Sequence, residues 1–302
     1  MKNGIARSPL FYVGDKYKLV REIRTHLPKN IHRLIEPFVG GGSVMMNVTA
    51  ESYLLNDIDS YVIGIHKMLA TYIGHEIDFY NKLYAIIDQY GLSLSYLHDV
   101  VPQDMKKAYP KTYYAKFNKE GYLQMKADFI AGGQSDMIRL YLLLIYGFNH
   151  MLRFNGKGQF NLPVGNVDFN QNVHDALNDY FNLLTQKQVT WYNEDFRQFL
   201  GVIQYQANDL VYLDPPYLIT FSEYNKLWNE DTERDLLAML DDLNERGVRF
   251  AISNVTHYRG RINHLFLQWS EHYHIHSIKS NYISFNDNSI KQFTEVLVTN
   301  YE

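Results

Sequence analysis

The sequence predicts an α/β protein in which a doubly wound sheet of seven strands carries an inserted, mainly helical domain. Seven short runs rich in β-branched and aromatic residues alternate with helical patterns, which is typical of a doubly wound sheet. The alternation stops between about residues 60 and 166, where no pair of strands is recognisable. A chain of 302 residues exceeds the roughly 100 to 200 residues of a single core. We therefore expect a sheet domain of residues 1–58 and 167–302 and an inserted domain of residues 59–166.

The predicted elements of the sheet domain are short strands with helices between them. In residues 231–246 four leucines share one face and Gly247 follows, as at the end of an amphipathic helix. The seven expected strands cover residues 31–35, 53–55, 188–192, 210–213, 248–253, 274–279 and 295–300.

Composition excludes several classes of protein. The absence of cysteine rules out disulfides, thiolate catalysis and iron–sulfur clusters. The longest apolar run, residues 140–148, is far shorter than the roughly 20 residues of a membrane span, and the N-terminus lacks the apolar core of a signal peptide. We expect a cytoplasmic protein without a membrane segment. His272, His274 and His276 alternate along an expected strand without acidic neighbours, so we expect no metal site there.

The charge is unevenly distributed along the chain. The formal net charge is −4, which gives no overall attraction to nucleic acid. Residues 61–167, however, hold 11 Lys and Arg against 8 Asp and Glu. Within them, residues 104–126 carry six lysines interleaved with five aromatic residues. This pattern fits a solvated helical face, and it also fits a local surface for a polyanion.

Two features of the first half of the sheet domain indicate a nucleoside-containing cofactor. A glycine-rich turn, residues 36–42, follows the first expected strand and precedes a helix expected from Ser43 to Val48, so backbone N–H groups can approach a ligand closely. Asp57 ends the second strand, 17 residues after Gly40, where a carboxylate commonly binds ribose hydroxyls. NAD and S-adenosylmethionine both fit these two features.

Asp214-Pro215-Pro216-Tyr217 follows the fourth expected strand and favours S-adenosylmethionine. Two prolines fix the backbone and leave carbonyl groups beside the Asp214 carboxylate. A carboxylate and a carbonyl that hold both N–H groups of a ring amine make its nitrogen a better nucleophile and stabilise the charge that develops on it. Tyr217 would offer a flat surface on which a flipped base can stack.

Three motifs in this order give the chain a family resemblance. Residues 11–16 (FYVGDK), 36–42 (EPFVGGG) and 214–217 (DPPY) resemble the Dam-type, or class alpha, DNA adenine-N6 methyltransferases over essentially the whole chain. The run DPPYLITFSEYNKLW, residues 214–228, is particularly similar to the Dam enzymes of T-even bacteriophages. The resemblance implies a class I, Rossmann-like methyltransferase core with an inserted target-recognition domain. It further implies transfer of a methyl group from S-adenosylmethionine to adenine N6 in a base flipped out of duplex DNA.

The resemblance also implies roles for individual residues. Tyr12 and Lys16 would contact S-adenosylmethionine from the N-terminal turn, Asp57 would bind its ribose, and Asp195 and Phe196 would flank its adenine. Asp214 would hold the target amine and, with Pro215, Pro216 and Tyr217, form the catalytic motif. The full set of expected cofactor contacts is Tyr12, Lys16, Glu36, Phe38, Gly40, Asp57, Asp195, Phe196 and Asp214.

The end of the insert, residues 146–155 and 158–165, resembles the DNA-recognition hairpin of this family. Arg153 could contact guanine O6 and N7, and Met151, Leu152 or Pro163 could contact a thymine methyl group. Phe148 and Asn149 could fill the space left by the flipped adenine. The expected DNA contacts are Phe148, Asn149, Met151, Arg153, Asn155 and Pro163. The target expected from the family is GATC, although residues 164–168 lack the basic side chains that GATC-specific relatives commonly carry there.

Three other functions fit part of the sequence but explain it less fully. A cytosine-N4 methyltransferase uses similar amine chemistry but more often has Ser at the position of Asp214. A nicotinamide oxidoreductase leaves residues 214–217 without a role, and a non-catalytic DNA-binding regulator has no need of them. The expected partner is double-stranded DNA, with no membrane and no stable protein partner. A cognate restriction endonuclease encoded elsewhere would place the protein in a restriction-modification system.

Overall fold

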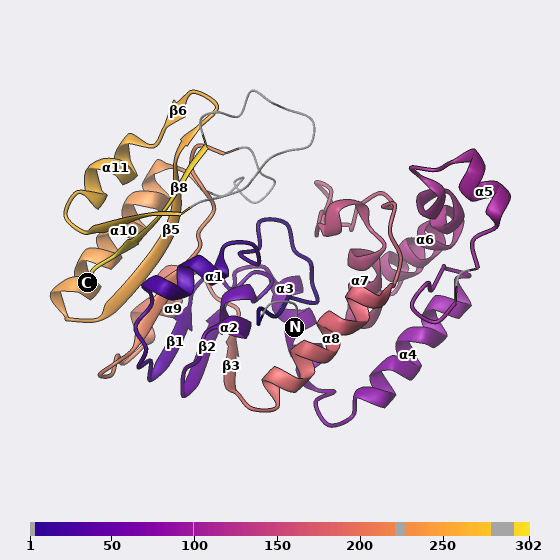
Figure 1. The fold of residues 1–302 in the computed structure, drawn as a ribbon, viewed down its shortest axis with the longest axis horizontal. Coiled ribbons are helices and arrows are strands. Elements are labelled where there is room, and N and C mark those ends of the chain that lie inside the picture. The colour runs from indigo at the N-terminus through magenta and orange to yellow at the C-terminus, as the bar shows by residue number, and fades with distance from the viewer. Residues whose placement is uncertain (1–3, 99, 221–227, 279–292) are drawn as a thin grey trace. The chain divides into compact units, whose positions relative to one another are not determined.

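The computed structural model describes residues 4–98, 100–220, 228–278 and 293–302, which form two compact units (Figure 1). The sheet unit comprises residues 16–39, 43–58 and 187–302, and the helical unit comprises 1–15, 40–42 and 59–186. The helical unit thus includes residues 1–15, 40–42 and 167–186, which the sequence placed in the sheet domain. For residues 171–184 the reason is packing, because this segment is an amphipathic helix whose apolar face meets other helices of the same unit.

The sheet unit confirms the predicted doubly wound α/β fold. Its strand order is β3-β2-β1-β4-β5-β8-β7, in which the chain runs outward from β1 in one direction and from β4 in the other. The first five strands in this order are parallel, and β8 is antiparallel to both β5 and β7. The point where the order reverses, between β1 and β4, is where sheets of this kind bind ligands. The seven strands are β1 (Arg33–Glu36), β2 (Ser52–Asn56), β3 (Gln188–Tyr192), β4 (Leu210–Leu213), β5 (Arg249–Tyr258), β7 (His274–Ile278) and β8 (Phe293–Thr299).

The strands at the β5 end of the sheet differ in extent from the expectation. Strand β5 continues to Tyr258 because β8 pairs with it along almost its whole length. A short strand that the sequence did not suggest, β6 (Arg261–Ile262), turns back onto β5 through Arg259 and Gly260, which both have positive φ. Lys279, at the end of the expected strand 274–279, lies outside the described residues.

Three helices cover one face of the sheet: α9 (Phe196–Val202), α10 (Glu230–Glu245) and α11 (His264–Ser270). Leucines of α10 and aromatic residues of α9 and α11 pack on alternate residues of the strands, which gives the unit its main core. Figure 1 shows α10 and α11 side by side, and they are in contact. Helix α10 confirms the predicted amphipathic helix, with Asn229 as its N-cap and Gly247 (φ 70°) after its last turn. The remaining helices of the unit are α1 (Val20–Ile23), the 3-10 helix η1 (Arg24–His26) and α2 (Ser43–Asn47).

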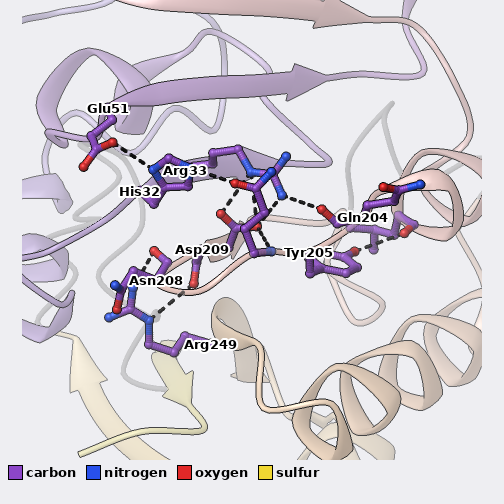
Figure 2. Close-up of polar contacts among 10 residues, drawn as sticks. His32, Arg33, Glu51, Gln204, Tyr205, Asn208, Asp209 and Arg249 are labelled. Carbon is purple, nitrogen blue, oxygen red and sulfur yellow. Dashed lines mark hydrogen bonds and ion pairs between the residues drawn. The ribbon is translucent and has the colours of Figure 1, made fainter.

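A buried ion pair joins the amino ends of the central strands (Figure 2). Arg33, the first residue of β1, donates from Nε to Asp209 Oδ1 at 3.0 Å, and Asp209 directly precedes β4. The Asp209 carboxylate also accepts the backbone N–H of Gln206 at 2.9 Å. Arg249 at the start of β5 donates to the carbonyl of Asn208. These contacts fix the starts of three adjacent strands, at the opposite edge from the carboxyl ends.

The helical unit is built around α7 (Met137–Ile145), in which Leu140 to Ile145 are all fully buried. Helices α3 (Ser60–Ala70), α4 (Glu76–Gln89) and α6 (Tyr113–Ala131) each contact α7. In Figure 1, α4 and α8 (Gln171–Leu184) run side by side, and Tyr80 of α4 donates to Asn178 of α8 at 2.8 Å. Helix α5 (Gln103–Ala108) and the 3-10 helix η2 (Phe148–His150) complete the unit. Among the described residues, no helix is both long and apolar enough to span a membrane.

Candidate active site

The two carboxylate oxygens of Asp214, at the carboxyl end of β4, are each held by a different side chain. Lys16 Nζ lies 2.6 Å from Oδ2, and the Tyr217 hydroxyl donates to Oδ1 at 2.7 Å. The side chain of Lys16 is only 4% exposed, whereas that of Asp214 is 21% exposed. Lys16 Nζ also lies 5.2 Å from the centroid of the Tyr217 ring. The carboxylate is therefore fixed in direction while part of it stays accessible.

The rest of the predicted DPPY motif forms a turn after β4. Pro215 is buried and Pro216 is half-buried. The Tyr217 carbonyl accepts the backbone N–H of Thr220 at 3.1 Å, which closes the turn. The structure thus brings Lys16, which the sequence singled out in the N-terminal turn, together with Asp214 and Tyr217 of the DPPY motif. Residues 221–227, which carry part of the similarity to the phage enzymes, lie outside the described residues.

Glu295 on β8 is a further member of this cluster that the sequence analysis did not identify. Its Oε1 lies 3.6 Å from Lys16 Nζ and 3.3 Å from the Tyr217 hydroxyl oxygen. The residue is 2% exposed, and its Oε2 has no hydrogen-bond partner among the described residues. Burial, the largest influence, raises the pKa of this carboxyl. The sequence offers one sign of its burial, which is an acidic residue directly before the apolar run Val296–Val298.

Glu36 is the last residue of β1, and Phe38 lies in the turn that follows. Glu36 is 2% exposed, its Oε1 has no partner among the described residues, and burial followed by the charge of Asp214 raises its pKa well above the usual value. The Phe38 ring lies 5.4 Å from the ring of Phe196 and 5.7 Å from that of Trp228. The sheet unit therefore offers a buried carboxyl and an aromatic group at the same edge.

The ends of β1, β2 and β3 are tied together by amides. Asn56 Nδ2 donates to the carbonyls of Pro37 and Glu194, both at 3.0 Å. Asn193 Nδ2 donates to the carbonyl of Asp57 at 2.8 Å. These bonds hold the backbone of Asp57, the expected ribose ligand, at the carboxyl edge of the sheet.

Asp195 and Phe196 begin α9, directly after β3. Asp195 is the N-cap, accepting from the backbone N–H of Arg197 at 2.9 Å, and it also pairs with the Arg197 guanidinium at 3.0 Å. Phe196 is 4% exposed and belongs to the main core. The structure gives both residues a structural role in addition to the cofactor contacts that the sequence predicts.

The glycine-rich turn continues into the helical unit with residues 40–42. Gly40 has a φ of 48°, and a Cβ on Gly41 would lie 3.1 Å from both Ser8 Oγ and Tyr12 Cβ. Tyr12 therefore packs against this turn. His66 of α3 is completely buried and contacts the Gly40 carbonyl from Nε2 at 2.8 Å. Glycine suits the turn for two reasons: the positive φ of Gly40 favours it, and the nearby side chains leave little room for a Cβ at Gly41.

Residues 146–165 form an antiparallel hairpin, with bridges between Gly147 and Val164 and between Phe154 and Phe160. Arg153 Nε donates to the Asn161 carbonyl at 2.6 Å, which uses one of the five guanidinium donors. The other predicted DNA contacts differ in exposure: Phe148, Asn149, Asn155 and Pro163 are exposed, Met151 is half-buried, and Leu152, named as an alternative thymine contact, is buried. The Asn155 side chain accepts from the backbone of Lys157 and Gln159, so it also shapes the tip of the hairpin.

Metal ligands do not cluster in the part of the chain that the structure describes, where no group of three or more His, Asp or Glu could hold an ion. His276 on β7 contacts Thr299 Oγ1 through Nε2 at 2.9 Å, as a side chain between paired strands does.

Comparison with known proteins identifies relatives over nearly the whole chain. The family model described as D12 class N6 adenine-specific DNA methyltransferase matches residues 12–283. The chain is 35% identical over 309 residues to the Type II methyltransferase M.FokI of Planomicrobium okeanokoites, an alignment that covers 99% of this chain and 43% of that protein. It is 32% identical over 307 residues to the modification methylase StsI of Streptococcus sanguinis, covering 98% and 43%. The chain thus spans less than half the length of these two relatives.

A third relative is similar to this chain in extent. A DNA adenine methylase of Vibrio cholerae is 30% identical over 274 residues, covering 84% of this chain and 83% of that protein.

Proposed function

Because the chain belongs to the D12 class N6 adenine-specific DNA methyltransferase family, we propose that it transfers a methyl group from S-adenosylmethionine to adenine N6 in duplex DNA. The observation that carries this proposal is the fixed carboxylate of Asp214 at the carboxyl end of β4. Relatives named as DNA adenine methylase and modification methylase support it.

In this proposal Asp214 binds the amino group of the target adenine. Lys16 and Tyr217 occupy one lone-pair region of each carboxylate oxygen, which leaves further lone pairs to accept an N–H of the amine. A carbonyl of the Pro215-Pro216 segment accepts the second N–H. The amine lone pair is then less delocalised into the ring, and the nearby negative charge stabilises the nitrogen as it becomes positive. The carboxylate is already oriented, so little reorganisation is needed at the moment of reaction.

The residues of the sheet unit fit S-adenosylmethionine. The buried Oε1 of Glu36 is an acceptor without a donor among the described residues, and Phe38 offers an aromatic surface next to Phe196. Asp57 would accept from the ribose hydroxyls, and Asp195 would lie beside the adenine. Tyr12 and Gly40 of the helical unit remain predicted contacts, as the resemblance implies. When bound, the cofactor supplies an activated methyl group on a sulfonium, so the protein needs no covalent nucleophile.

The inserted residues 59–166 would recognise the DNA, while residues 1–58 and 167–302 would bind cofactor and catalyse transfer. In this proposal the adenine is flipped out, because a base that stays paired and stacked cannot place its N6 amine against Asp214. Phe148, 52% exposed on the hairpin, would fill the vacated space. We propose GATC as the target, with Arg153 contacting a guanine. Two relatives are named Type II methyltransferase and modification methylase, which favours a restriction-modification role for this chain. In that role it would act on DNA in the cytoplasm.

The test is a methylation assay with labelled S-adenosylmethionine and a duplex library of random sequence. We expect label in N6-methyladenine within GATC. Asp214→Ala should abolish transfer while duplex binding is retained, because the carboxylate acts on the amine and not on the phosphates. More than a few per cent of the wild-type turnover in this variant would contradict the role of Asp214. Label in N4-methylcytosine, or DNA binding without any transfer, would favour the alternative functions.

A further inference from the structure

Glu295 provides a second carboxyl beside the proposed acceptor Asp214. It comes from β8, whereas Asp214 and Tyr217 follow β4 and Lys16 precedes α1. On β8 its register partners are Val255 of β5 and Ile278 of β7, both apolar. Among the described residues, the titratable groups that face it are therefore Lys16, Asp214 and Tyr217, which are also those that act on its pKa.

The hydrogen bonds of Tyr217 limit what Glu295 can do. A tyrosine hydroxyl has a single hydrogen, and here it is directed at Asp214 Oδ1, the shorter of its two contacts at 2.7 Å. Glu295 Oε1 lies 3.3 Å from the same hydroxyl oxygen, which can still accept a hydrogen bond. A protonated Glu295 would donate to Tyr217 while Tyr217 donates to Asp214. In this arrangement the hydroxyl of Tyr217 and that of protonated Glu295 each donate one hydrogen bond. Asp214 is then the ionised carboxylate that pairs with the Lys16 ammonium.

We propose that Glu295 is a positioning residue for methyl transfer, which in its neutral form holds the Tyr217 hydroxyl and the Lys16 ammonium on Asp214. This inference rests on the proposed function. Burial favours the neutral form, because the charged form of a carboxyl loses its hydration in the interior. Ionisation of Glu295 would create a second anion that competes with Asp214 for Lys16, 3.6 Å away.

The proposal predicts different behaviour for two substitutions. Glu295→Gln keeps a neutral side chain that can donate to Tyr217, so kcat near pH 7 should stay within about threefold of the wild-type value. Glu295→Leu removes the donor and should lower kcat by roughly 10- to 100-fold, with little change in the KM for S-adenosylmethionine. The wild type should lose activity as the pH rises through the pKa of Glu295, and Glu295→Gln should lose less of it.

Two further measurements keep the outcome clear. Thr294→Val, at the exposed neighbouring position on β8, is the control for changes in the strand. Calorimetric binding of S-adenosylmethionine and circular dichroism show whether each variant is folded. Difference infrared spectra between wild type and Glu295→Gln, recorded at the pH of maximal activity, should show the loss of one carboxylic-acid C=O band. A residue with only a packing role in its ionised form would not give this band.

These measurements distinguish a failure of the positioning role of Glu295 from a failure of the proposed methyltransferase function. If the wild type does not methylate adenine, the proposed function fails, whereas the infrared band still reports the protonation of Glu295. If the wild type is active and folded Glu295→Leu matches Thr294→Val in kcat, the positioning role is wrong. It is also wrong if Glu295→Gln loses as much kcat as Glu295→Leu, or if the pH profiles of Glu295→Gln and wild type coincide.

Discussion

His66 makes the stability of the helical unit depend on pH. It is completely buried in α3, with Nε2 2.8 Å from the Gly40 carbonyl oxygen and Nδ1 2.8 Å from the Tyr180 hydroxyl. A carbonyl oxygen only accepts, so Nε2 carries the hydrogen and Nδ1 accepts from Tyr180. Protonation of Nδ1 would turn this acceptor into a second N–H donor and would place a positive charge in the interior. Burial accordingly lowers the pKa of His66 from 6.5 to about 4.

The size and sign of the effect follow from proton linkage. Between about pH 6.5 and pH 4 the unfolded chain binds a proton at His66 that the folded chain does not bind, so stability is lost as the pH falls. With these two pKa values, His66 alone should remove about 2 kcal/mol from the free energy of unfolding between pH 7 and pH 5.

Urea unfolding at pH 7 and pH 5 tests this expectation by comparing wild type with His66→Gln. Glutamine keeps an amide donor for the Gly40 carbonyl but does not titrate, so the variant should lose less stability on acidification, by about 2 kcal/mol. His75→Gln makes the same chemical change at an exposed position of this unit and is the control. Equal losses for wild type and His66→Gln would refute the reasoning.

Two other substitutions test the hairpin and the buried ion pair. Arg153→Ala should cost roughly 1 to 3 kcal/mol of discrimination at one base pair of the target, measured by methylation of GATC and its single-base variants at two salt concentrations. An equal loss on every duplex, with a shallower salt dependence, would instead indicate a phosphate contact. Asp209→Ala should lower the free energy of unfolding by about 3 kcal/mol in urea, because it leaves the Arg33 guanidinium without its carboxylate partner. Adding Arg33→Met should recover part of this loss, and a cost below about 1 kcal/mol for Asp209→Ala alone would contradict the role of the pair.

The sequence by itself determined the fold class and the positions of seven strands, because the signals for them are local. Each strand is a short apolar or β-branched run, and α10 is defined by the spacing of its leucines and by Gly247. The same holds for the motif at residues 214–217, in which neighbouring residues carry the chemistry. The family resemblance rests on such short motifs, and the family match over residues 12–283 agrees with it.

Contacts between residues far apart in the chain were decided only by the tertiary structure. Glu295 is 78 residues from Tyr217, so neither spacing nor periodicity connects them, and its place beside Lys16 depends on β8 returning next to β5. The His66 contact with Gly40 likewise requires α3 to pack against the glycine-rich turn. The sequence placed a domain boundary at residue 167, whereas α8 packs within the helical unit. An amphipathic pattern shows that one face of a helix is buried, but it does not show which element covers that face.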